Sequence, residues 1–400
     1  MDPVLGEWLS LLLRWAHIIT GIAWIGSSFL FMWLDSHLEP PETPKKGVEG
    51  ELWMTHSGGF YVVEKMQLAP DEVPRTLHWF KWEAAWTWFT GFLLLMVVYY
   101  LGSASFLIDP EVADISHAQA IMISLALFVA AWVVYDGMYR SPLRNTGAWA
   151  EIVGIVLLCI VIWGLTHIFS GRGAYVHVGA MIGTIMVANV WMIIIPGQRK
   201  LVEATKAGTA LDARLAFNAK QRSVHNNYLT LPVVFVMISS HYAGTYGHEY
   251  NWLILIAMFV IGAMARHWFN LRNAGSKAIW PVPVAALGFI ALAYVASPYF
   301  ASPGSASADA DAEPVTFAQA YEIILNRCVS CHAEKPSDEN FDKAPKNVRF
   351  DTPRQIKNEA ARIRAVSVLT KTMPLGNQTK MTVAERVLLG RWIADGAEIE

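Results

Sequence analysis

Eight long apolar segments constrain this sequence more than any other feature. Each has about 20 mostly apolar residues, the length that a helix needs to cross the hydrocarbon core of a bilayer. Charged residues make up 16% of the chain, against about 25% in soluble domains. The pattern predicts an all-α, polytopic membrane helix bundle of about eight transmembrane helices, with membrane lipid as its surroundings. The segments cover residues 15–34, 82–101, 118–138, 148–168, 174–195, 226–245, 251–269 and 280–299.

The composition changes after residue 300, which divides the chain into three parts. Residues 1–300 form the predicted integral membrane domain. Residues 301–314 (ASPGSASADADAEP) are small and polar, too poor in apolar side chains to build a core, so we expect a flexible linker. Residues 315–400 have the composition of a soluble domain. The net charge of −2 gives no support to a nucleic-acid partner.

Lysine and arginine predict the orientation of the chain in the membrane. Four alternate loops, 35–81, 139–147, 196–225 and 266–279, hold sixteen of these residues, whereas the other loops and the N-terminal tail hold only Arg14 and Arg172. By the positive-inside rule the first set is cytoplasmic. Eight spans then place the N-terminus and the C-terminal domain in the periplasm of a bacterial inner membrane.

A weak internal repeat relates the two halves of the membrane domain. His17 and His177 each lie a few residues inside a span that enters from outside. Arg75 with His78, and Arg222 with His225, each precede a later span. The spacing fits a 4+4 arrangement of parallel repeats. The alternative is that arginine and histidine both favour membrane interfaces.

The strongest chemical motif lies in the C-terminal domain. Cys328-Val329-Ser330-Cys331-His332 is a C-x-x-C-H sequence, which attaches haem covalently through two thioethers and supplies a histidine to the iron. The rival reading is a zinc or redox pair, but a zinc site would need further ligands and no second cysteine pair exists. Haem is attached in this way outside the cytoplasm, in agreement with the predicted orientation. The motif therefore predicts one covalent haem c.

The C-terminal domain resembles small class I cytochromes c. A helical pattern precedes the cysteines, and a second amphipathic segment, 383–394, ends in Arg391-Trp392-Ile393. The resemblance implies that the two helices pack together and that Met373, followed by Pro374, is the second axial ligand of the iron. A methionine ligand raises the reduction potential of a haem, which favours electron acceptance.

Ionisable residues inside membrane spans are costly, so each is a candidate for function. Those near the outer side are His17, His117, His167, His177 and His241. Those near the inner side are His56, His78, His225, His267, Arg75, Arg222 and Arg266. The loop after the first span is rich in aromatic residues, which a structureless linker would rarely carry. We expect this loop to fold back against the helices.

The whole chain resembles the bacterial membrane-bound urate oxidases, or urate hydroxylases (the PuuD family). The match rests on the segments 14–29 (RWAHIITGIAWIGSSF), 50–53 (GELW), 56–65 (HSGGFYVVEK), 77–83 (LHWFKWE) and 107–110 (LIDP), and on the order of membrane domain, linker and cytochrome. The resemblance implies oxidation of urate to 5-hydroxyisourate, with electrons passed to the fused haem and on to a periplasmic acceptor or terminal oxidase of the respiratory chain. A weaker resemblance of the first span to small membrane haem proteins of the protoporphyrinogen-oxidase type implies a haem b ligand at His17, and the repeat then adds His177.

Urate is a planar anion, so its site needs aromatic faces, a cation and a base. We predict His56, His78 and His225 as candidates for the base, because histidine exchanges protons near neutral pH. Arg75 and Arg222 are the candidate partners of the anion. The bilayer core is about 30 Å thick, so a cytoplasmic-side site needs a relay to a periplasmic haem; otherwise the site lies on the outer side. The rival function is an electron-transfer module that passes electrons from quinol through haem b to the cytochrome.

Overall fold

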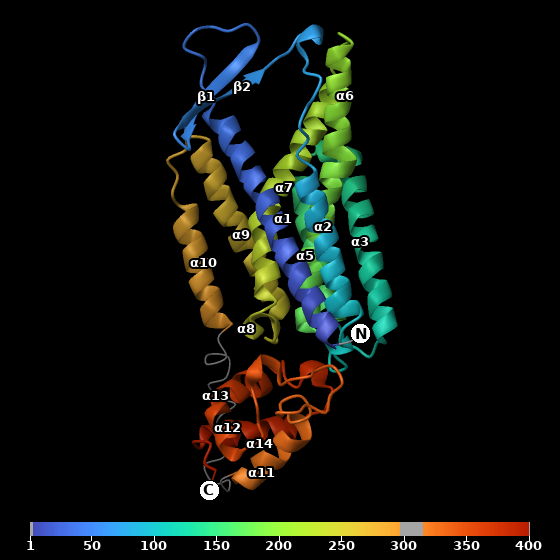
Figure 1. Ribbon diagram of the computed structural model, residues 1–400, viewed down its shortest axis with the longest axis vertical. Helices are drawn as coiled ribbons and strands as arrows, with labels where there is room; N and C mark the ends of the chain where they lie inside the picture. Colours follow the sequence, from blue (N-terminus) through green and yellow to red (C-terminus); the bar gives the residue numbers. More distant parts are fainter. Residues whose placement is uncertain (1–2, 297–314, 400) are drawn as a thin grey trace.

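The computed structural model describes residues 3–296 and 315–399. Helices run side by side in one bundle, and the C-terminal domain lies against one end of it (Figure 1). The all-α fold class is confirmed. The long helices are α1 (Pro3–His37), α2 (Trp82–Leu95), α3 (His117–Arg140), α4 (Trp149–Thr166), α5 (Gly171–Ala188), α6 (Ile195–Lys206), α7 (Ala213–Ser239), α9 (Asn251–Asn273) and α10 (Pro281–Val295). Two π-helical segments, η2 (Met96–Tyr100) and η5 (Asn189–Ile194), extend α2 and join α5 to α6.

Each of the eight predicted spans contains a helix, although residues 297–299 of the last span lie outside the described residues. Six of the described helices are long and apolar enough to cross a membrane. The predicted spans 226–245 and 280–299 correspond to α7 and α10. Helix α10 is short, with 15 residues. Helix α7 has 27 residues, but its mean hydropathy is lowered by polar side chains such as Arg222, His225 and Asn226. Those polar side chains lie where the candidate site is found.

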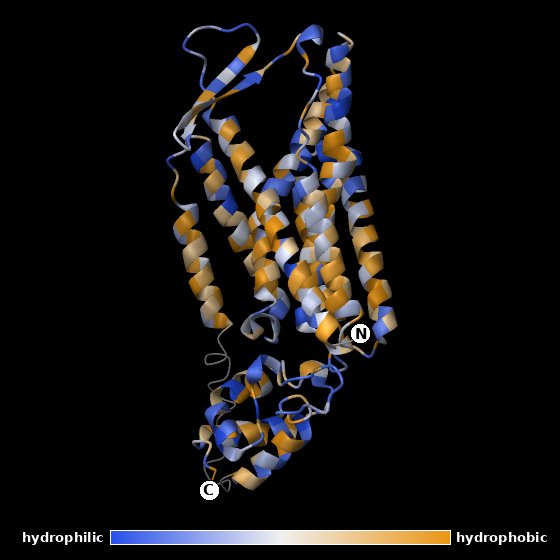
Figure 2. Ribbon diagram, in the orientation of Figure 1, coloured by the Kyte–Doolittle hydropathy of each residue, from blue (hydrophilic) through white to orange (hydrophobic). Residues whose placement is uncertain are grey.

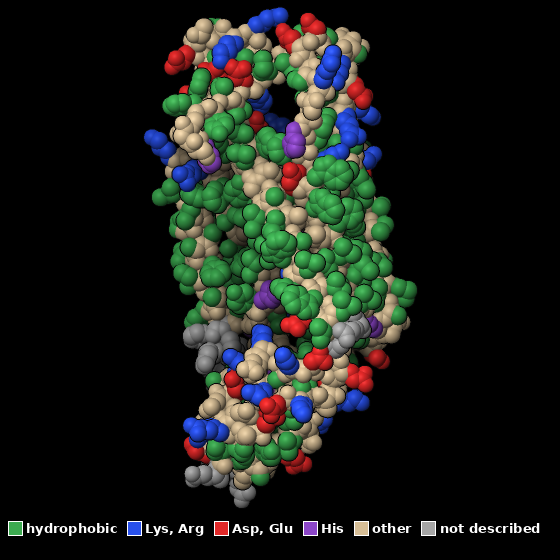
Figure 3. Space-filling model, viewed as in Figure 1, with side chains coloured by type: hydrophobic (Ala, Val, Ile, Leu, Met, Phe, Trp, Pro, Cys, Tyr) green, Lys and Arg blue, Asp and Glu red, His purple; other side chains and the backbone are tan. Residues whose placement is uncertain are grey.

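The surface of the bundle is arranged as a membrane requires. Apolar residues form a continuous belt along the middle of the helices, and charged residues gather beyond both ends of the belt (Figures 2 and 3). The N-terminus and the C-terminal domain lie at the same end, whereas the first long loop and the end of α6 lie at the other (Figure 1). The chain therefore has the form of a membrane protein whose soluble domain shares a side with the N-terminus.

The aromatic loop after α1 forms a structure that the sequence did not predict. Strands β1 (Val48–His56) and β2 (Gly59–Met66) pair antiparallel, and the hairpin stands beyond the end of the bundle instead of folding back against it (Figure 1). Its turn has positive φ at Ser57 and Gly58. Pairing between the strands satisfies the backbone hydrogen bonds, so the segment needs little support from the helices.

The C-terminal domain is built around two helices, as predicted. They are α11 (Phe317–Arg327) and α14 (Val383–Ala394). Capping boxes start both, with Thr316 and Gln319 on the first and Thr382 and Glu385 on the second. The ring centroids of Phe317 and Trp392 lie 5.8 Å apart, so the two helices pack directly. The predicted linker, 301–314, lies outside the described residues.

Short polar contacts hold the C-terminal domain on the bundle. Asn377 donates to the carboxylate of Glu111 at 2.7 Å, and Gln378 donates to Ser103 at 3.1 Å and also to Ser105. Gly376 allows the close approach, because a Cβ at that position would lie 2.7 Å from the Cβ of Ser105. The loop that follows Met373 is therefore the part of this domain that docks on the segment between α2 and α3.

Candidate functional site

A cavity of about 1370 Å³ lies between the C-terminal domain and the adjoining end of the bundle. Cys328, Cys331, His332 and Met373 all line it. The fold thus brings the three residues of the C-x-x-C-H motif together with the methionine that the resemblance to class I cytochromes c implied. The opposite wall comes from the membrane domain and includes Asp109, Arg172, His241, Tyr246 and Asn251. A group held by the two cysteines would therefore face the ends of the membrane helices.

The C-x-x-C-H residues are arranged as a haem site requires. Helix α11 ends at Arg327, and the carbonyl of the next residue, Cys328, accepts a hydrogen bond from the backbone N–H of His332 at 2.9 Å. His332 Nδ1 lies 2.9 Å from the carbonyl of Val348. That contact fixes the ring and leaves Nε2 for a metal. Burial lowers the pKa of His332, which favours the neutral imidazole that binds iron.

The two cysteine thiols lie at the wall of the cavity, and burial disfavours their ionisation. Both are free. Burial raises the pKa of the Cys328 thiol to about 12, with a smaller contribution from Cys331. Burial likewise raises the pKa of Cys331. Within residues 3–296 and 315–399, no group of three or more histidine, cysteine or acidic side chains could hold a bare metal ion. The residues present thus fit a haem with one nitrogen and one thioether ligand.

Arg386 supports the methionine side of the cavity, and sequence reasoning missed it. Its side chain is only 3% exposed. It donates to the carbonyls of Ser367 at 2.5 Å and Met373 at 2.7 Å. Both acceptors are backbone atoms, so no side-chain pattern could have predicted the contact. Arg386 fixes the loop that carries the thioether of Met373.

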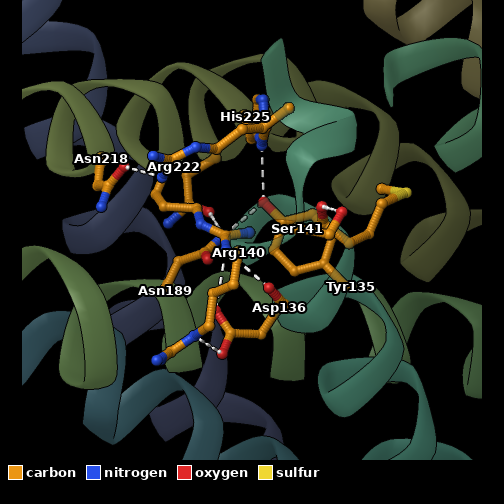
Figure 4. A network of polar contacts seen from close by, with 11 residues as sticks. Tyr135, Asp136, Arg140, Ser141, Asn189, Asn218, Arg222 and His225 are labelled. Carbon is orange, nitrogen blue, oxygen red and sulfur yellow. Dashed lines mark hydrogen bonds and ion pairs between the residues drawn. The ribbon is translucent and has the colours of Figure 1, made fainter. Parts of the chain in front are cut away.

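A first buried polar cluster lies between α3, η5 and α7, and we call it the Asp136 cluster (Figure 4). The guanidinium of Arg222 is 3% exposed and lies 2.8 Å from the carboxylate of Asp136. It also lies over the rings of Tyr135 and Tyr139, at 4.6 and 4.9 Å from their centroids. Arg222 was predicted to bind an anion, but its charge already has a carboxylate partner.

The remaining members of the Asp136 cluster connect His225 to two asparagines. The Tyr135 hydroxyl lies 2.7 Å from Nδ1 of His225. It also accepts a hydrogen bond from the amide of Asn189 at 3.1 Å, and that amide donates to Asn226 at 2.9 Å. The cluster therefore comprises Tyr135, Asp136, Asn189, Arg222 and His225, which Figure 4 labels, together with Asn226.

A second buried polar cluster lies on the other side of α7, and we call it the Arg266 cluster. Arg266 is 0% exposed. Its Nε donates to the side-chain oxygen of Asn227, whose amide donates to Asn270 at 3.0 Å. The Cζ atom of Arg266 lies 3.6 Å from the ring centroid of Phe29 on α1. Both terminal nitrogens of the guanidinium lack a hydrogen-bond partner among the described residues.

A tyrosine–histidine pair belongs to this second cluster. Nδ1 of His267 lies 2.8 Å from the hydroxyl of Tyr228. Tyr228 and His267 follow Asn227 and Arg266 directly in sequence, so both contacts cross the same interface between α7 and α9. The Arg266 cluster comprises Phe29, Asn227, Tyr228, Arg266, His267 and Asn270.

The two histidines linked to haem b by the sequence lie at different levels of the bundle. Nδ1 of His17 lies 2.9 Å from the carbonyl of Thr87, and a Cβ at Gly91 would lie 2.7 Å from its ring. His177 is fully buried, and its ring lies near that of Tyr99, with a centroid distance of 5.9 Å. Residues 91 and 99 are about 12 Å apart along a helix. Because the two rings lie at different levels, the pair does not fit the two sides of one iron. His177 shares the fixed ring of His17, since its Nδ1 lies 2.7 Å from the carbonyl of Gly173, and its Nε2 has no hydrogen-bond partner among the described residues.

The other predicted site residues lie apart from both clusters. His56 is exposed at the end of β1, with its Nδ1 2.8 Å from Ser57 Oγ. His78 precedes α2 and lies edge-on to Phe80, with ring centroids 4.6 Å apart. Arg75 is exposed in the same loop. The structure therefore brings Arg222 and His225 together but leaves these three residues at the surface.

Comparison with known proteins identifies the membrane domain. Residues 3–297 match the family described as Urate oxidase N-terminal. No curated protein and no solved structure matches the chain. The family match covers the bundle with both buried clusters and ends before the domain that carries the C-x-x-C-H motif. Because that match spans well over half of the sequence, the chain belongs to the urate oxidase N-terminal family.

Proposed function

We propose that this protein oxidises urate to 5-hydroxyisourate among its membrane helices and delivers the electrons to a c-type haem in its C-terminal domain. One observation carries the proposal. The cavity lined by Cys328, Cys331, His332 and Met373 has the ends of the membrane helices as its other wall. An electron acceptor in that cavity would be docked on a domain of the urate oxidase family.

The proposed reaction is balanced without molecular oxygen. Urate and one water give 5-hydroxyisourate, two protons and two electrons. A haem bound in the cavity supplies a one-electron acceptor, so the electrons leave urate one after the other. Hydrogen peroxide is not a product. The protein itself has to bind a planar anion, orient a water and accept the protons.

Each buried cluster offers a histidine that could accept a proton. His225 contacts Tyr135, and His267 contacts Tyr228, in each case through Nδ1. When Nδ1 donates to the tyrosine oxygen, Nε2 keeps its lone pair and can act as a general base. His56 and His78 lack such a buried setting. We therefore propose that one of the two tyrosine–histidine pairs takes the protons of the reaction.

The distance between the clusters and the cavity requires an intermediate carrier. Asn251 lines the cavity, and Arg266 lies fifteen positions further along α9, about 22 Å away at 1.5 Å per residue. His17 is the residue that we propose as a ligand of a haem b in between. The fixed Nδ1 of His17 supports that assignment, as does Gly91, which lets the ring of His17 pack closely against α2.

We further propose that the C-terminal domain is periplasmic and passes its electrons to a periplasmic acceptor or a terminal oxidase. The N-terminus and this domain lie at one end of the bundle (Figure 1). The loops rich in lysine and arginine are at the other end, as expected for cytoplasmic loops.

Anaerobic spectroscopy on the full-length protein in membranes tests the function. Urate should reduce the c-haem band without oxygen, and a quinol analogue should not. If only the quinol analogue reduced the c-haem band, the protein would be an electron-transfer module and not a urate-oxidising enzyme. A pyridine haemochrome spectrum on the same sample should show haem c together with haem b, and the haem b signal should be lost in His17→Ala. Acid–acetone extraction should leave haem c on the protein.

A further inference from the structure

The guanidinium of Arg266 is a buried positive charge that no described residue neutralises. Its side chain is 0% exposed, and no ion pair joins it to an acidic residue in the described part of the chain. Its one hydrogen bond goes from Nε to the neutral amide oxygen of Asn227. The two terminal nitrogens have no acceptor there. Arginine cannot lose its proton in a protein, so the charge itself cannot be avoided.

A buried charge without a partner destabilises the folded protein unless a counter-ion binds to it. Buried charges in proteins are paired, because apolar surroundings do not compensate for the hydration free energy that a charge loses on burial. In a membrane span the cost is higher still, and unpaired ionisable residues mark the sites of substrates or ions. The missing partner of Arg266 is therefore an anion that accepts hydrogen bonds from both terminal nitrogens.

The surroundings of Arg266 restrict the shape of that anion. Phe29 covers one face of the guanidinium, with 3.6 Å between Cζ and the ring centroid, and Asn227 occupies the Nε edge. The edge formed by the two terminal nitrogens is buried and has no hydrogen-bond acceptor among the described residues. A guanidinium edge binds two acceptors that lie side by side in one plane. Adjacent ring nitrogen and carbonyl oxygen atoms of a purine anion are such a pair.

We propose that Arg266 binds the anionic edge of urate and that His267, held by Tyr228, accepts the proton. This inference rests on the proposed function and assigns its substrate site to the α7–α9 interface. The Asp136 cluster also combines an arginine, a tyrosine–histidine pair and asparagines, but there Arg222 is paired with a carboxylate at 2.8 Å. An anion there would have to compete with the carboxylate of Asp136. The two clusters therefore differ in net charge.

Equilibrium dialysis of labelled urate against the detergent-purified holoprotein tests the assignment without turnover. Arg266→Gln keeps the hydrogen bond to Asn227 and removes the charge. It should raise the Kd for urate at least tenfold, and Arg266→Lys should give an intermediate value because it lacks the planar edge. Arg272→Gln, an arginine on the same helix beyond the cluster, should leave the Kd unchanged.

A thermal shift on the same variants separates binding from folding. Urate should raise the Tm of the wild-type protein but not that of Arg266→Gln. Without urate, Arg266→Gln should be at least as stable as the wild type, because an unpaired charge has been removed.

Two results would overturn the inference and leave the function intact: wild-type affinity in Arg266→Gln, or a loss of affinity in Arg222→Gln instead. Failure of the wild-type protein to bind urate at all would overturn the proposed function itself.

Discussion

The two polar clusters beside α7 contain nearly the same side chains and differ in one respect. Each has an arginine that is at most 3% exposed, a histidine on a tyrosine hydroxyl and asparagines that hydrogen-bond to each other or to the arginine. Of the two, only the cluster between α3, η5 and α7 also holds a carboxylate, that of Asp136, 2.8 Å from Arg222. One cluster is electrically complete, and the other carries a net positive charge.

This difference separates an arginine that stabilises the fold from an arginine that binds a ligand inside a membrane bundle. Burial and residue type do not separate Arg222 from Arg266. The two arginines differ in the number of their unsatisfied hydrogen-bond donors and in the presence of a counter-ion. Arg222 stabilises a helix interface through its ion pair with Asp136, whereas the charge of Arg266 is neutralised only when an anionic ligand binds.

The largest effect is expected from removing the carboxylate that completes the first cluster. Asp136→Asn leaves Arg222 buried without a counter-ion, so the free energy of unfolding should fall by about 4 kcal/mol. Unfolding of the purified protein by SDS measures this. Arg140 shares the same carboxylate but is exposed, so Arg140→Gln should cost less than about 1 kcal/mol. Equal losses in both variants would mean that Asp136 does not neutralise Arg222.

A smaller but still large effect should separate the two histidines. His267→Gln keeps a polar contact to Tyr228 but cannot accept a proton, so kcat for urate should fall by about 100-fold with the Kd unchanged. His225→Gln should lower kcat by a smaller factor, because His225 lies in the cluster whose arginine is already paired with a carboxylate. The two values of kcat, taken from stopped-flow reduction of haem, decide the point, and the reverse order would move the chemistry to the Asp136 cluster.

The smallest effect is expected from a substitution that gives the Arg266 cluster a carboxylate like that of the Asp136 cluster. Asn227→Asp places a carboxylate beside Nε of Arg266, as Asp136 does for Arg222. The ligand-free protein should become more stable, and the Kd for urate should rise about tenfold, or 1.4 kcal/mol, since the new charge competes with the substrate. Asn226→Asp, one position earlier on α7, is the matched control and should not change the Kd. Tighter urate binding by Asn227→Asp would contradict the comparison.

The helices could be predicted from the sequence because their signals are local, and the proposed haem-attachment residues could be selected for the same reason. Apolar runs of about 20 residues determine where helices cross, and Cys328, Cys331 and His332 are near neighbours in sequence. The hairpin β1–β2 was missed because we interpreted its aromatic residues as packing against the helices. Phe60, in β2, is instead 83% exposed.

The clusters could be predicted only in part because their contacts span large sequence separations. Arg222 and His225 were selected as isolated ionisable residues, yet their partners Asp136 and Tyr135 lie 86 and 90 positions away. Arg266 was noted near the inner side but not selected, because no sequence pattern reveals that it lacks a counter-ion. Whether a buried charge is compensated is a property of the packed bundle, not of the segment that carries it.

The central claim is that electrons from urate arrive at the haem fastened to the C-terminal domain. A single-turnover titration of the purified protein without oxygen tests it most directly, with urate consumption and haem reduction recorded together. The account predicts that each urate consumed yields 5-hydroxyisourate and leaves two electrons on protein-bound haem, with no hydrogen peroxide when air is admitted to turning-over enzyme. Urate consumption that requires oxygen, produces peroxide and leaves the haem oxidised would contradict it.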